Sequence, residues 1–157
     1  MENTITWQVP LFSNKQNQMY SISEKIRISK KALLEKSVFL NNEIIPAATV
    51  KFICCDCSHE NRVEIIPHQS GFPILQIYNE DKVLPKNELL KHEIVTTTSP
   101  GMLHFGELTV NQLPTLYFGT HCKTCYSKYI CVFGYGEKQP GMTILQISGI
   151  WKYEEIQ

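Results

Sequence analysis

Two pairs of cysteines, each with two residues between its members, constrain the fold of this chain more than any other feature. The first pair is Cys54 and Cys57, and the second is Cys122 and Cys125. This spacing lets both thiolates of a tight turn face one point, and two such turns together supply the four soft ligands that hold structural zinc. Each pair lies between two strand-like runs, which are 49–53 and 62–66 for the first pair and 115–118 and 129–133 for the second. The sequence therefore predicts two hairpins that share a metal ion.

The pattern of strand, cysteine turn and strand resembles the knuckle of zinc ribbon and rubredoxin-like proteins. It covers residues 51–66 and 118–133. The resemblance implies that one zinc ion is bound by a set of four ligands: Cys54, Cys57, Cys122 and Cys125.

Three neighbouring residues offer alternative ligands. Cys55 creates a competing spacing with Cys57, but the first and fourth positions of a knuckle converge, so Cys55 should point away. His59 and His121 lie beside the pairs and could replace a sulfur, although we expect surface histidines there. Cys131 lies among apolar neighbours and is expected in the core.

Length and composition favour a single folded domain over residues 1–157. The chain is 43% hydrophobic and 19% charged, as in a globular protein. The knuckle hairpins should span about 49–66 and 115–133. Since 64 residues separate Cys57 from Cys122, we expect an insertion with its own structure at about 67–114. The predicted fold class is a β-rich α+β domain, with an antiparallel sheet, two zinc knuckles and one or two short helices.

Local patterns predict the remaining elements. We expect strands within 1–14 (ending near Pro10), 19–28, 72–78 and 142–153. Helices are expected at 30–36, capped by Ser29, and at 85–92, with a helical turn at 108–113. Loops are expected at 96–101 and 134–141.

The first residues lack the basic and apolar regions of a secretory signal, and no apolar stretch approaches the roughly 18 residues that span a bilayer. We therefore expect a cytoplasmic protein with reduced thiols and no membrane partner.

Enzymatic functions find little support in the sequence. Dithiol oxidoreductases place their cysteine pair at a helix N-terminus, whereas strand-forming residues follow both pairs here. A catalytic zinc needs an open coordination position, which four cysteines would close. Asp56 and Glu60 lie near the first pair and are expected to be solvated. We expect no enzyme, with a metal or redox enzyme as the third alternative.

Nucleic-acid binding is the second alternative, because aromatic and basic residues of the last hairpin could form a stacking surface. The residues considered are Tyr126, Lys128, Tyr129, Phe133, Tyr135, Lys138, Trp151, Lys152 and Tyr153. Their region, 121–157, has four lysines against three glutamates, and the whole chain has no net charge. This balance gives a phosphate backbone little attraction.

Protein binding is the expected function. Residues 37–120 contain nine acidic against five basic residues, which suits a basic partner, and the loop expected at 134–141 could contact it. A small zinc-stapled protein of this kind could be an immunity protein that neutralises a basic toxin.

Overall fold

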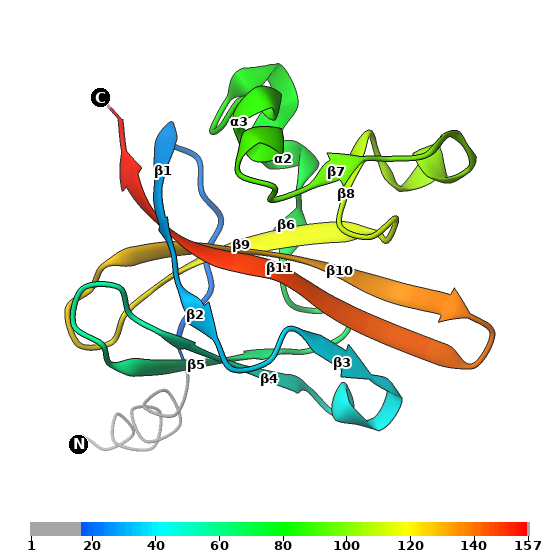
Figure 1. The fold of residues 1–157 in the computed structure, drawn as a ribbon, viewed down its shortest axis with the longest axis horizontal. Coiled ribbons are helices and arrows are strands. Elements are labelled where there is room, and N and C mark those ends of the chain that lie inside the picture. Colours follow the sequence, from blue (N-terminus) through cyan, green and yellow to red (C-terminus); the bar gives the residue numbers. More distant parts are fainter. Residues whose placement is uncertain (1–16, 157) are drawn as a thin grey trace, which may run out of the picture.

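The structure is a computed structural model that describes residues 17–156. The fold has three layers (Figure 1). A long antiparallel sheet, called sheet A, lies in the middle, with a second sheet on one face and an insertion on the other. The bounds of the strands of sheet A are β1 (Ile26–Lys31), β3 (Val38–Leu40), β6 (Phe72–Pro73), β9 (Thr115–His121), β10 (Lys128–Gln139) and β11 (Met142–Glu155). Their order is β1-β11-β10-β9-β6, and β3 also pairs with β11.

The centre of sheet A is buried on both faces, which explains the continuous apolar run from Tyr129 to Phe133 in β10. Tyr129, Cys131 and Phe133 face one hydrophobic cluster, while Ile130 and Val132 face another. Side chains of a strand alternate between faces, so a strand covered on both sides must be apolar at every position.

The second sheet, called sheet B, covers one of these faces. It consists of β2 (Leu33–Leu34), β4 (Ala48–Ile53) and β5 (Glu60–Ile65), in the order β2-β4-β5. Burial alternates along β4, with Ala48, Val50 and Phe52 turned to the core. Period-two burial of this kind is expected of a strand with one face in water.

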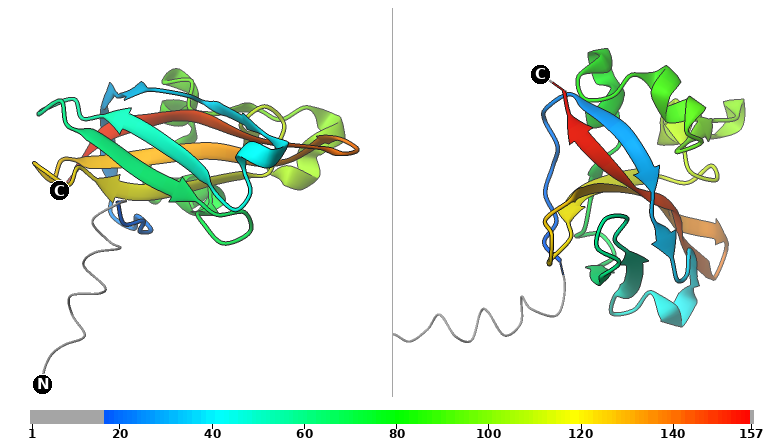
Figure 2. Two further views of the ribbon diagram at one scale, coloured as in Figure 1. Left: turned by 90° about the horizontal axis from the view of Figure 1, so that it is seen from below. Right: turned by 60° about the vertical axis from the view of Figure 1, so that its left-hand side comes forward.

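The insertion covers the opposite face of sheet A. Its elements are α2 (Leu75–Tyr78), η3 (Asn79–Asp81), α3 (Lys86–Lys91), β7 (Thr96–Thr97), η4 (Pro100–Phe105) and β8 (Leu108–Thr109). Apolar residues such as Ile77, Leu84 and Leu89 pack there against Ile130 and Val132 of β10. The right-hand view of Figure 2 shows the helices on one side of the long strands and β4–β5 on the other.

These features confirm the predicted β-rich antiparallel fold with short helices. The strands around the two cysteine pairs, the last strand and the helix that follows Pro85 all form near the predicted residues. Among the described residues, no helix is long and apolar enough to cross a membrane.

The predicted helix at 30–36, with Ser29 as its cap, is wrong. Residues 26–31 and 33–34 are β1 and β2, and the chain passes here from the edge of one sheet to the edge of the other. The Ala32 N–H donates to Ile150 O of β11 at 2.8 Å, and Leu33 is paired with Ile53 of β4. Partners supplied by two separate sheets therefore override local helix propensity.

Three further predictions for the insertion need correction. Residues 72–78 form the two-residue strand β6 and then helix α2, not one strand. Residues 108–109 are strand β8 and not part of a helical turn, because they pair with β7. The expected loop at 96–101 contains β7 and the start of η4.

The loop predicted at 134–141 is also wrong. β10 continues to Gln139 and β11 begins at Met142, so the turn is short and lies at the end of a long hairpin. Gly134 serves close packing, since a Cβ atom there would lie 2.9 Å from Val110 O and 3.0 Å from Leu113 Cβ. A glycine in a strand often marks such a backbone approach.

The strand predicted within 1–14 lies outside the described residues. Of the strand predicted at 19–28, Tyr20 forms an isolated bridge with Gly119, and continuous pairing begins only at Ile26.

Candidate metal centre

The first cysteine turn begins where β4 ends and closes with its own backbone hydrogen bonds. The Cys54 N–H donates to His59 O at 3.0 Å, and the Ser58 N–H donates to Cys54 O at 3.1 Å. Ser58 has a φ of 63°, which lets the chain reverse tightly before β5.

The second turn, between β9 and β10, repeats this arrangement. The Cys122 N–H donates to Ser127 O at 2.9 Å, the Tyr126 N–H donates to Cys122 O at 2.9 Å, and Tyr126 has a φ of 66°. The two turns are therefore built alike, although their sequences share only the cysteines.

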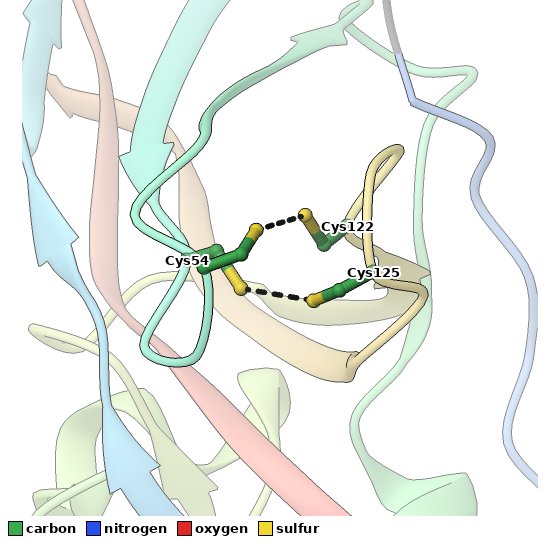
Figure 3. A group of neighbouring side chains, drawn as sticks. Cys54, Cys122 and Cys125 are labelled. Carbon is green, nitrogen blue, oxygen red and sulfur yellow. Dashed lines mark hydrogen bonds between the residues drawn. The ribbon is translucent and has the colours of Figure 1, made fainter.

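The two turns face one another and bring four sulfurs together. Cys54 Sγ lies 3.5 Å from Cys125 Sγ, Cys57 Sγ lies 3.5 Å from Cys122 Sγ, and all four sulfurs lie within 4.8 Å of one another. Figure 3 shows the sulfurs of Cys122 and Cys125 pointing across the gap toward the turn that carries Cys54. Tetrahedral coordination with zinc–sulfur bonds of about 2.3 Å sets sulfurs about 3.8 Å apart, so the cluster has the dimensions of a four-cysteine metal site.

The cluster joins sheet A to sheet B. Cys54 and Cys57 belong to the β4–β5 hairpin of sheet B, while Cys122 and Cys125 belong to the β9–β10 hairpin of sheet A. Cys54 and Cys122 are buried, whereas Cys57 and Cys125 are exposed. A metal bound here would link sheet A to sheet B at one end of the two packed sheets, through two buried and two exposed ligands.

Hydrogen-bond donors already point at the sulfurs, as thiolates require. The backbone N–H groups of Asp56 and Thr124 donate to the sulfurs of Cys54 and Cys122, each at 3.4 Å. The buried Tyr129 hydroxyl adds a further donor to Cys54 Sγ at 3.2 Å. Donors of this kind favour the charged form of a thiol and orient metal ligands.

The pKa values of the Cys54 and Cys57 thiols, whose sulfurs lie close together, are shifted in opposite directions. Burial raises the pKa of Cys54, but donors from Tyr129 and the turn outweigh it and lower that pKa to about 6. For Cys57, a hydrogen bond with the backbone of His59 lowers the pKa, yet partial desolvation and the neighbouring sulfurs raise it to about 12. A divalent cation would neutralise this mutual repulsion, because coordinating thiols are deprotonated outright.

Asp56 links the two turns, although its sequence position suggested a solvated side chain. Its carboxylate accepts hydrogen bonds from the Ser127 hydroxyl, in the other turn, and from Lys152 Nζ at 3.0 Å. The Lys152 ammonium and the Ser127 hydroxyl hold the pKa of the Asp56 carboxyl below its usual value.

Asn61 makes a second link that sequence reasoning missed. Its buried Oδ1 accepts from the Lys123 N–H of the other turn at 3.0 Å and from Asn17 Nδ2 at 3.1 Å, and its Nδ2 donates to His59 O at 3.2 Å. One sequence signal could have indicated this link. Asn61 lies in a strand in which every second residue should face the core, and a buried amide needs hydrogen-bond partners.

Three residues beside the cysteine pairs lie outside the cluster. Cys55, His59 and His121 do not belong to the four-sulfur cluster found among the described residues. The Cys55 N–H donates to Tyr129 Oη at 2.7 Å. Cys131 is fully buried, and burial raises the pKa of its thiol.

The aromatic stacking surface considered for the last hairpin does not exist as one surface. Tyr129, Phe133, Trp151 and Tyr153 are buried in the two cores, and only Tyr126 is broadly exposed, at 68%. The alternating aromatics therefore serve packing on the two faces of sheet A.

Comparison with known proteins adds no family. No protein-family model matches the chain, and neither curated proteins nor solved structures gave a significant match.

Proposed function

We propose that the protein is a non-enzymatic protein-binding module whose fold is stabilised by one structural zinc ion. The four-sulfur cluster supports the structural zinc ion in this proposal. Thiolates from Cys54, Cys57, Cys122 and Cys125 would fill every position of a tetrahedral ion, and such closed sites stabilise folds and do not bind substrates.

The absence of an open position favours a binding role over metal catalysis. The cluster also lies in two strand–turn–strand hairpins, whereas redox pairs lie at helix N-termini. Burial of most of the candidate stacking aromatics argues against the nucleic-acid alternative. We also propose that the protein is cytoplasmic, where its cysteine thiols would stay reduced.

The acidic part of the chain suggests where a basic protein could bind. Residues 37–120 fold into different layers, so their charge is divided between opposite faces. Within the insertion, five acids stand against three lysines: Glu80, Asp81, Glu88, Glu93 and Glu107 against Lys82, Lys86 and Lys91. We propose that the partner binds the face of the molecule formed by the insertion. We further propose that this partner is a basic toxin, which would make the protein an immunity protein.

A binding experiment tests this assignment. The partner is captured from native lysate, identified by mass spectrometry and purified, and its association rate is measured at low and high salt. Reversing Glu80, Asp81 and Glu88 to lysine should slow association at low salt, roughly tenfold or more, because complementary charge accelerates encounter.

The matched control reverses Glu60 and Glu64, which lie in β5 on the other side of sheet A. An unchanged rate in the insertion variant would contradict the assignment, as would tight, salt-sensitive binding to single-stranded nucleic acid alone.

A further inference from the structure

A cleft of about 610 Å³ lies where the insertion meets sheet A. Four segments line it: residues 31–37, where the chain passes from β1 to β3, residues 93–96 after helix α3, residues 109–111 at the end of β8, and residues 146–148 of β11. Polar and apolar atoms contribute about equally to the lining. We call it the Glu93 cleft, after the acid in its lining.

Hydrogen bonds hold the insertion against β11 on two sides of the cleft. The Ser148 hydroxyl donates to Ile94 O at 2.6 Å, and Asn111 Nδ2 donates to Gln146 Oε1 at 2.9 Å. Because Asn111 donates through its nitrogen, its Oδ1 remains an acceptor. The cleft is therefore formed by the protein itself, as ligand pockets usually are.

Glu93 occupies a backbone position that suits glycine. It follows the last turn of α3 with a φ of 58°, and the Ile94 N–H donates to Leu89 O at 2.9 Å. Helices that end in this way usually have glycine at the left-handed position, because a Cβ atom makes that conformation costly. No ion pair joins Glu93 to another residue in the described part of the chain. The fold thus keeps a carboxylate without an ion-pair partner where glycine would be more stable.

The cleft also contains a base, Lys31, which already has a partner. Its Nζ lies over the Trp151 ring, 5.4 Å from the ring centre. An ammonium group in this position is attracted by the face of the ring. The Glu93 carboxylate is therefore the charge in the lining that a ligand can pair, and the cleft is complementary to a cation.

We propose that the Glu93 cleft binds an arginine side chain of the partner. A guanidinium group has several donors in one plane, enough for both the Glu93 carboxylate and Asn111 Oδ1. The apolar stem of arginine suits the apolar part of the lining, which includes Ile94 and Val95. Arginine is also enriched among the residues that fill pockets at protein interfaces and dominate binding. The inference deepens the proposed function, because it rests on a basic partner that binds the insertion.

The methylamide of N-acetyl-arginine, an arginine side chain on an uncharged backbone, tests the cleft without the partner. We expect it to shift the NMR signals of the Asn111 and Gln146 side-chain amides in a saturable way. Glu93→Gln should raise its dissociation constant about threefold, the usual effect of an exposed ion pair, and Lys31→Gln should lower it. Glu107→Gln is the matched control: it changes the charge of the insertion equally but lies outside the lining, so binding should not change.

Glu93→Gly separates binding from stability. It should weaken binding of the same probe as much as Glu93→Gln does, yet raise the melting temperature, because glycine adopts a φ of 58° without a Cβ penalty. A lower melting temperature would show that the Glu93 side chain serves the fold, and it would overturn the proposal.

Three binding results would also overturn it. The first is the absence of saturable shifts, and the second is equal weakening in Glu93→Gln and Glu107→Gln. The third is tighter binding of the methylamide of N-acetyl-glutamate, lost in Lys31→Gln, because the cleft would then suit an anion. All these measurements omit the partner, so their failure is distinct from a failure to capture a basic toxin.

Discussion

At the scale of single residues, Tyr129 shows how the core supports the candidate metal site. Its ring packs against Phe52 of sheet B, with ring centres 5.0 Å apart, while its hydroxyl bonds to both Cys54 Sγ and the Cys55 N–H. Burial and the Cys54 sulfur raise the pKa of this hydroxyl, so it stays a donor. One side chain thus connects hydrophobic packing with ligand orientation.

Tyr129→Phe should therefore weaken the metal site while keeping the core packed. Removing the hydroxyl leaves a sulfur and an N–H without this partner, which costs about 1–3 kcal/mol of unfolding free energy. Metal affinity should fall roughly tenfold or more, as for other groups that orient ligands. Competition with a chromophoric chelator measures the affinity, and denaturant unfolding measures the stability.

Tyr126→Phe is the matched control, because Tyr126 lies in the other turn but is exposed. Equal losses in both variants would contradict a specific role for the Tyr129 hydroxyl.

At the scale of elements, the long β10–β11 hairpin depends on close contact with the segment 110–113. Gly134→Ala would place a Cβ atom 2.9 Å from Val110 O, a backbone atom that cannot move alone. We expect a loss of about 1–3 kcal/mol of unfolding free energy, as for other overpacked sites.

Gly101→Ala, where an added Cβ meets nothing within 4 Å, should be close to neutral. Urea denaturation of the two variants gives the comparison. A Gly134→Ala protein as stable as the wild type would contradict a close-packing role for Gly134.

The elements also show what the sequence could predict. The cysteine hairpins were predictable because cysteine spacing, flanking strands and turn are contiguous in the chain. The strand pair β1–β2 was not, because Ala32 and Leu33 find their partners in Ile150 and Ile53, which belong to different sheets.

The candidate site shows the same limit. The cysteine spacing and its resemblance to a zinc knuckle indicated the four sulfurs, whereas the links made by Asp56, Asn61 and Tyr129 cross from one hairpin to the other. Such links depend on how two segments that are distant in sequence pack together, and no local sequence pattern predicts that packing.

At the scale of the whole molecule, the cysteine cluster fastens sheet A to sheet B at one end of the sandwich. Residues 71 positions apart meet there, so a bound metal would restrain a long stretch of chain. Metal affinity that exists only in the folded state adds directly to folding free energy.

Chelation should consequently lower the melting temperature, by roughly 10–20 °C for a loss of several kcal/mol in a chain of this size. Cys55→Ser should barely change it, because Cys55 lies outside the cluster. Calorimetry with and without a chelator measures both effects. An unchanged melting temperature after complete metal removal would rule out a structural metal.

Elemental analysis measures whether one zinc ion is bound by Cys54, Cys57, Cys122 and Cys125. Protein expressed without added metal should contain close to one equivalent of zinc per chain. The double variant Cys122→Ser/Cys125→Ser should lose it, whereas Cys55→Ser should retain it. Protein free of zinc after careful purification, or zinc retained in the double variant, would show that these four cysteines do not bind zinc.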